Sequence, residues 1–156
     1  MARFSPRGLA FGELALESFR LNNRLLDAGD RLSADLGMTS ARWQVLGTLV
    51  RAGGSLTVAE IARRMGLKRQ SVQRIADRLD ADGIVAFVSN PRHRRASLVE
   101  PTAVGLDVLE RLETRRSGWA DDVATDLDAD AIEAAASVLR KIRERLETEA
   151  AQSGTS

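Results

Sequence analysis

The sequence predicts a mainly α-helical fold with a small β-hairpin wing, in which a winged helix-turn-helix is joined to a helical dimerisation region. Three observations predict this class. A T-x-x-E capping signal opens a short helical pattern, which a glycine separates from a second one. Two short β-prone runs follow, joined by an arginine-rich tip. Long amphipathic stretches lie before and after, an arrangement that suits a dimer binding two DNA half-sites.

The amino-terminal part of the chain predicts two helices. We expect residues 1–11 to fray, because they contain a proline and a glycine. Apolar residues at helical spacing over residues 13–36 predict a long helix that Gly37 ends. Thr39 is a suitable N-cap for the next helix, which continues to the glycine pair that begins at Gly53.

The central part predicts the winged module itself. Thr57 and Glu60 form the capping box, and Gly66 ends the short helix that they begin. The predicted elements are an extended link, two helices and two strands, at residues 55–57, 58–65, 68–82, 84–89 and 96–100.

The carboxyl-terminal part predicts two more helices. Thr102 begins one that reaches about Asp126, and a second capping box of Asp130 and Glu133 begins the other. Apolar residues of this last helix are spaced alternately three and four apart, which is typical of a seam for a partner helix. The seam consists of Ile132, Ala135, Leu139, Ile142 and Leu146.

The flanking helices carry apolar stripes that no single one of them can bury, so we expect them to pack together with their copies in a homodimer. A monomer whose terminal helices cover one another is the alternative. The expected organisation is an N-terminal dimerisation helix, a DNA-binding domain, C-terminal dimerisation helices and a polar tail, at residues 1–37, 38–101, 102–150 and 151–156.

Composition excludes several classes of protein. The 156 residues contain no cysteine and one histidine, His93, so we expect no disulfide, no metal site and no cofactor. The longest apolar stretches are shorter than the roughly 20 residues that span a bilayer. No secretory leader is evident, so we expect a cytoplasmic protein without a membrane partner. No nucleophile–base pair or phosphate loop is recognisable, which argues against an enzyme.

Charge is strongly polarised along a chain whose net charge is only +1. Residues 61–95 hold nine basic and three acidic residues, a net charge of +6. The rest of the chain holds 14 basic and 19 acidic residues, a net charge of −5. This distribution favours a polyanion such as double-stranded DNA as the partner of the central module.

Residues 68–82 predict an amphipathic reading helix. Its apolar face consists of Val72, Ile75, Ala76 and Leu79. Gln70, Gln73 and Arg74 lie on the opposite face and are suited to base edges, glutamine to adenine and arginine to guanine. Asp77 shares that face and argues against DNA binding, because its carboxylate would face the duplex unless it pairs with Arg74 or Arg78. Phosphate contacts are expected from Lys68, Arg69, Ser71 and Arg78. An ordinary solvated face is the alternative.

The tip between the predicted strands carries Arg92, Arg94 and Arg95. Folding of a hairpin does not require three close cations, which repel one another. We therefore expect one arginine in the minor groove and its neighbours on phosphates, with an ordinary solvated loop as the alternative.

These motifs resemble the MarR family of winged helix-turn-helix transcription regulators. The resemblance covers residues 36–124 and includes LGMTSARWQVLGTL, IARRMGLKRQSVQRIADRLDADGIV and NPRHRRASLVEPTAVG. Two departures are His93, where the wing of the family usually has an aspartate, and Lys68, which replaces a small hydroxyl residue. The resemblance implies an effector pocket for a small aromatic or phenolic compound, for which Arg42 and Trp43 are the candidate residues.

The sequence thus predicts a sequence-specific DNA-binding transcription regulator: a ligand-responsive repressor that binds a pseudo-palindromic operator as a homodimer. Two alternatives remain open. One is a winged-helix module that binds an acidic protein, and the other is a nonspecific architectural DNA binder. Salt-dependent binding to duplex DNA would separate a DNA-binding protein from the first alternative. The second alternative predicts equal affinity for scrambled duplexes.

Overall fold

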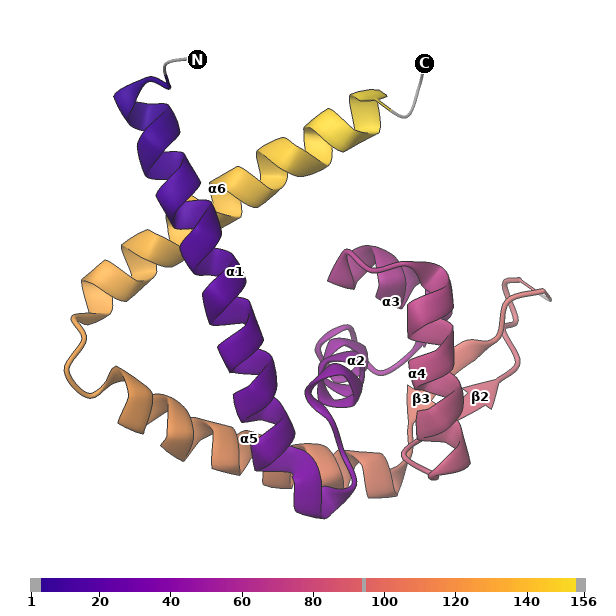
Figure 1. Cartoon of the computed structure of the whole chain (residues 1–156). Coiled ribbons are helices and arrows are strands. Elements are labelled where there is room, and N and C mark those ends of the chain that lie inside the picture. Colours follow the sequence, from indigo (N-terminus) through magenta and orange to yellow (C-terminus); the bar gives the residue numbers. More distant parts are fainter. Residues whose placement is uncertain (1–3, 94, 154–156) are drawn as a thin grey trace. The chain divides into compact units, whose positions relative to one another are not determined.

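The computed structural model describes residues 4–93 and 95–153 and confirms a mainly helical fold with a small antiparallel sheet (Figure 1). The chain divides into two compact units, Met1–Arg116 and Ser117–Ser156. The elements in chain order are α1 (Pro6–Ser33), the 3₁₀ helix η1 (Ala34–Leu36), α2 (Ser40–Arg51), β1 (Leu56–Thr57), α3 (Val58–Met65), α4 (Arg69–Ala81), β2 (Val85–Val88), β3 (Leu98–Pro101), α5 (Ala103–Ala124) and α6 (Ala129–Ser153).

The first helix begins earlier than the sequence suggested. The expected start near Glu13 is wrong, because α1 begins at Pro6 and includes most of the segment that we expected to fray. Ser5 caps this end by accepting a hydrogen bond from the amide of Gly8 over 3.1 Å. Proline suits the first turn of a helix, where its missing N–H has no intrahelical acceptor.

The caps of the central helices are confirmed. The Thr39 hydroxyl accepts a hydrogen bond from the amide of Arg42 over 3.3 Å at the start of α2. At α3 both halves of the capping box form: the Glu60 carboxylate accepts from the amide of Thr57, and the Thr57 hydroxyl accepts from the amide of Glu60. Gly66 ends α3 with φ +64°, a conformation that favours glycine.

The sheet has three strands where the sequence predicted two. Its order is β1-β3-β2, and both pairs are antiparallel. Residues 56–57, expected to be a plain link, pair with β3 in the register Leu56–Val99 and Thr57–Leu98. β2 and β3 form the hairpin wing beside α4 (Figure 1). The wing is therefore anchored to the residue that caps α3.

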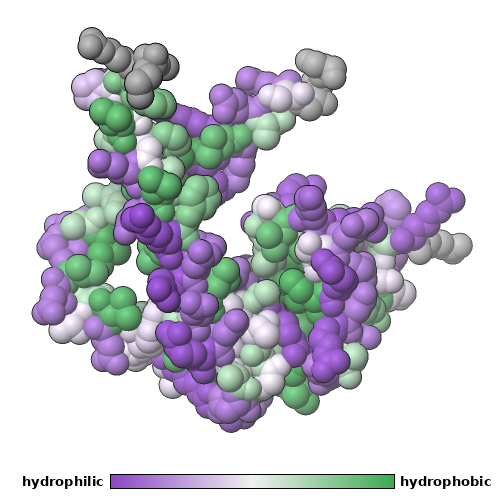
Figure 2. Space-filling view, viewed as in Figure 1, coloured by the Kyte–Doolittle hydropathy of each residue, from purple (hydrophilic) through white to green (hydrophobic). Residues whose placement is uncertain are grey.

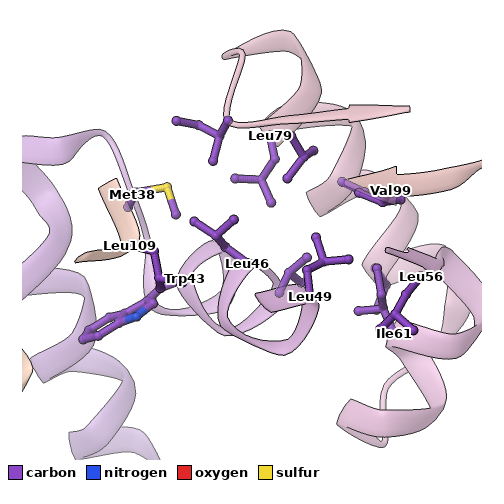
Figure 3. Close-up of a cluster of buried hydrophobic side chains, with 14 of the residues drawn as sticks. Met38, Trp43, Leu46, Leu49, Leu56, Ile61, Leu79, Val99 and Leu109 are labelled. Carbon is purple, nitrogen blue, oxygen red and sulfur yellow. The ribbon is translucent and has the colours of Figure 1, made fainter. Parts of the chain in front are cut away.

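A single apolar core holds the module together (Figure 3). α2 supplies Val45, Leu46 and Leu49, which are fully buried. Around them lie buried side chains from the other elements of the module, including Leu56, Ile61, Val72, Leu79, Val99, Leu109 and Leu112. Because α3, α4 and the sheet share this core, the positions of their exposed faces are fixed relative to one another.

The start of α5 is joined to the end of the reading helix. The amide of Thr102 donates to the Ile84 carbonyl over 3.0 Å, and its hydroxyl donates to the Gly83 carbonyl over 2.7 Å. Gly105 is buried against Ile84, where a side chain at position 105 would overlap the Ile84 carbonyl oxygen. This close approach requires glycine.

The second unit differs from the prediction at both ends of α6. Asp128, not Asp130, caps the helix, since its Oδ1 accepts from the amide of Ala131 over 2.9 Å. α6 continues to Ser153, so the described part of the expected polar tail is helical. Alanines and glutamine at 150–152 are good helix formers, which explains the extension.

The seam residues of α6 follow one side of this helix. No residue of α6 is buried, and Ile132, Leu139 and Leu146 are 43%, 39% and 53% exposed. Across residues 4–93 and 95–153, no helix combines the length and apolarity required to cross a membrane.

Candidate nucleic-acid interface

The reading helix α4 has the predicted two faces. Val72, Ala76 and Leu79 are buried in the core. Gln70 and Arg74 are exposed, while Ser71 and Gln73 are half-buried. The helix therefore offers a polar face to a partner while its opposite face holds it in the module.

The first turn of α4 is cationic and has no side-chain cap. Lys68 occupies the N-cap position, and its side chain supplies no acceptor for the first amides of the helix. Both Lys68 and Arg69 are exposed. A helix start with free N–H groups and two cations is suited to phosphate oxygens.

Asp77 has a different partner from the two arginines that the sequence suggested. Its Oδ1 accepts a hydrogen bond from Nε2 of Gln73 over 2.7 Å. Asp77 forms no ion pair with Arg74 or Arg78. Arg78 instead directs its Nε to the Asp82 carboxylate over 3.3 Å, while its side chain stays 69% exposed. The i,i+4 spacing of Gln73 and Asp77 brings the two side chains together on one helix face.

The tip of the wing is shaped by local hydrogen bonds. The side chain of Asn90 accepts from the amide of Arg92 over 2.9 Å, and the Asn90 carbonyl accepts from the amide of His93 over 3.2 Å. Arg92, His93 and Arg95 are exposed. Arg94, also predicted to contact DNA, lies outside the described residues.

Two hollows bring the wing and the helix-turn-helix together. One, of about 360 Å³, is lined by Arg69, Gln73 and Asp77 of α4 and by Arg95 of the wing. The other, of about 690 Å³, is lined by Glu60 and Arg63 of α3 and by Arg92 and His93 of the wing. The structure thus places predicted residues from both segments on one continuous surface.

Glu60 has a perturbed carboxyl group at this surface. Hydrogen bonds from the backbone and hydroxyl of Thr57 lower the pKa of Glu60 below its ordinary value, and the neighbouring Arg63 and Arg64 act in the same direction. The carboxylate is already engaged in the capping box. Its chemistry is therefore that of a helix cap, and Glu60 holds α3 in place.

The two candidate effector residues have structural partners. The guanidinium of Arg42 donates to the Gly37 carbonyl and to the Asp82 carboxylate, joining the start of α2 to the end of α4. Trp43 is 8% exposed in the core, and its indole N–H donates to Glu113 over 3.3 Å. Sequence reasoning missed Asp82 and Glu113, which lie 40 and 70 residues from their partners.

Within residues 4–93 and 95–153, no group of three or more acidic, histidine or cysteine side chains is placed to hold a metal ion. The exposed cations of α4 and the wing suit phosphates, and the amides of Gln70 and Gln73 suit base edges.

Known proteins match this chain over both the module and its flanks. Residues 36–96 match the model of the MarR family. An uncharacterised protein of Mycobacterium tuberculosis is 34% identical over 136 residues, covering 87% of this chain and 94% of that protein. The HTH-type transcriptional repressor MdtR of Bacillus subtilis is 31% identical over 116 residues, which is 74% of each chain. The chain belongs to the MarR family. This confirms the resemblance found in the sequence.

Solved structures of transcription regulators have the same fold. The PcaV transcriptional regulator of Streptomyces coelicolor, in complex with its natural ligand, is 27% identical with a TM-score of 0.68 and covers 92% of this chain and 98% of its own. A cysteine-to-serine mutant of MarR from Escherichia coli, complexed with operator DNA, is 25% identical with a TM-score of 0.68 and covers 79% of this chain and 91% of its own. This MarR-family chain is a DNA-binding transcription regulator and not an enzyme.

Proposed function

We propose that this MarR-family protein is a homodimeric, ligand-responsive repressor that acts in the cytoplasm on a pseudo-palindromic operator. The observation that carries the proposal is the shared surface of α4 and the wing, where Gln73 and Arg95 line one hollow. A helix with base-reading side chains beside a cationic loop suits simultaneous contact with two grooves of one duplex.

Exposed apolar side chains support the homodimer. α1 buries only Ala28, Gly29 and Ser33. Figure 2 shows hydrophobic surface over α1 and, on the second unit, over α6. The large exposed apolar residues of these two helices are Leu9, Phe11, Leu16, Phe19, Leu21, Leu25, Ile132, Val138, Leu139 and Leu146. A second copy is the partner that two-fold operators require.

We assign residues 1–37 and 102–150 to dimerisation and residues 38–101 to DNA binding. A repressor is favoured over an activator because MdtR matches over 74% of its length. The transcriptional activatory protein BadR of Rhodopseudomonas palustris is 34% identical but matches over only 55% of its length.

Base and backbone contacts are divided among the exposed residues. We assign base edges to Gln70, Gln73 and Arg74, and the minor groove to Arg95. Phosphate contacts are assigned to Lys68, Arg69, Ser71, Arg78, Arg92 and Arg94. Arg74→Ala is expected to relax preference at one position of each half-site, with a cost there of ~1–3 kcal/mol. Arg95→Ala is expected to lower the affinity for all DNA sequences by similar factors. If this variant binds DNA as tightly as the wild type, the proposed role of the wing is wrong.

For the effector we propose a small aromatic or phenolic compound. A regulator 16% identical to this chain was solved with 2,4-dichlorophenol, and PcaV with its natural ligand. Arg42 and Trp43 are proposed to lie near the effector site. The test is release of operator DNA by such compounds, with Arg42→Ala as the variant that loses the response.

Selection from random duplexes, followed by binding at increasing salt, tests the proposal as a whole. A palindromic consensus is the expected result. A dimer that contacts roughly 6–10 phosphates is expected to lose about 10³–10⁵ in affinity between 50 and 200 mM salt. Equal affinity for all duplexes indicates an architectural binder, and the absence of binding to DNA indicates a protein-interaction module.

A further inference from the structure

Gln73 and Asp77 lie one helical turn apart on the exposed side of α4, and their side chains form a hydrogen bond. Nε2 of Gln73 donates to Oδ1 of Asp77 over 2.7 Å. Both side chains line the hollow that also contains Arg95. A carboxylate on a surface that binds a polyanion lowers affinity for every duplex. On this surface the side chain of Asp77 instead makes a hydrogen bond with Gln73.

The carboxylate fixes the direction of the glutamine amide. An ionised carboxylate only accepts hydrogen bonds, whereas the two ends of an amide differ: the nitrogen donates and the oxygen accepts. Asp77 therefore keeps Nε2 of Gln73 directed toward its carboxylate. If the amide were reversed, the carbonyl oxygen of Gln73 would face a carboxylate oxygen of Asp77, and the two would repel each other. One N–H and the carbonyl oxygen of Gln73 stay free, which leaves one donor and one acceptor for a partner.

We infer that Asp77 is a specificity-determining residue that sets Gln73 to read adenine and to reject guanine. In the major groove adenine presents an acceptor at N7 and a donor at N6, which match the free N–H and carbonyl of Gln73. Guanine presents two acceptors, N7 and O6, so the fixed carbonyl oxygen would face O6. This inference rests on the proposed function, because it requires α4 to lie in the major groove.

The test compares base preferences of the full-length dimer and its variants on duplexes substituted at single positions. Gln73→Ala identifies the position that Gln73 reads. There the wild type is expected to prefer adenine by about ten- to a hundredfold. Asp77→Asn keeps the size of the side chain but offers Gln73 either a donor or an acceptor, so discrimination against guanine is expected to fall to about threefold or less.

Asp80→Asn is the matched control. Asp80 is exposed on the same helix and carries the same charge, but it does not contact Gln73. Its substitution is expected to raise affinity for all duplexes and to leave the adenine preference unchanged.

Each other outcome overturns the inference. It is wrong if Asp77→Asn keeps the full preference for adenine, if the wild type selects guanine, or if Gln73→Ala alters no position, and in these cases the proposed operator binding stands. A wild-type protein that binds every duplex equally contradicts the proposed sequence specificity itself.

Discussion

Replacing Gly105 with alanine tests the packing of α5 against the end of the reading helix. The new Cβ would overlap the carbonyl oxygen of Ile84 and lie 3.1 Å from its carbonyl carbon. That oxygen already accepts two hydrogen bonds from Thr102. Overpacking costs about 1–3 kcal/mol, and each weakened hydrogen bond about 1 kcal/mol. The higher helix propensity of alanine offsets about 1 kcal/mol of this loss. The expected loss of stability is about 2–4 kcal/mol.

Thermal unfolding at one fixed protein concentration measures this loss. At about 2–4 °C per kcal/mol, Gly105→Ala should lower Tm by about 4–16 °C. Gly118→Ala in the same helix is the control, because nothing lies within 4 Å of a Cβ at that position. This control should match or slightly exceed the wild type. A Gly105→Ala protein that melts within about 1 °C of the wild type would refute the reasoning.

Three further predictions concern stability. Thr57→Ala should cost about 1 kcal/mol at pH 7 by urea unfolding. Because the folded state lowers the pKa of Glu60 from 4.5, the associated stabilisation is present above that value and is lost as the pH falls through the folded pKa. Glu60→Gln should remove this part of the pH dependence, and an unchanged acid profile contradicts it. Arg42→Ala should cost about 2–3 kcal/mol, since its mostly buried guanidinium joins α2 to Asp82. The control is Arg24→Ala, because the side chain of Arg24 is exposed; it should change stability by less than about 0.5 kcal/mol. If the two substitutions change stability equally, burial of Arg42 does not explain its contribution.

Features that depend on neighbours three or four residues away were predicted well from the sequence. The caps at Thr39 and Thr57 and the helix end at Gly66 are of this kind. The start of α1 was wrong because Pro6 was interpreted as a helix breaker, although proline suits a first turn. The cap of α6 was assigned two residues too late, since Asp128 and Asp130 offer the same acceptor chemistry.

Long-range contacts could not be predicted, because one sequence carries no pattern for them. Arg42 meets Asp82 across 40 residues, and β1 pairs with β3 across about as many. The Gln73–Asp77 pair was within reach, since its spacing is visible in the sequence. It was missed because only arginines were considered as partners of the aspartate.

Thr57 belongs to two hydrogen-bonded systems at once, as the strand partner of Leu98 and as the N-cap of α3. A slip of β3 by one residue would turn its apolar side chains away from the core and separate the loop from the turn that Thr57 starts. Thr57 therefore links the register of the sheet to the start of α3. It fixes the distance between the arginine-rich loop and α4, and hence the spacing of the two surfaces that we propose to contact DNA.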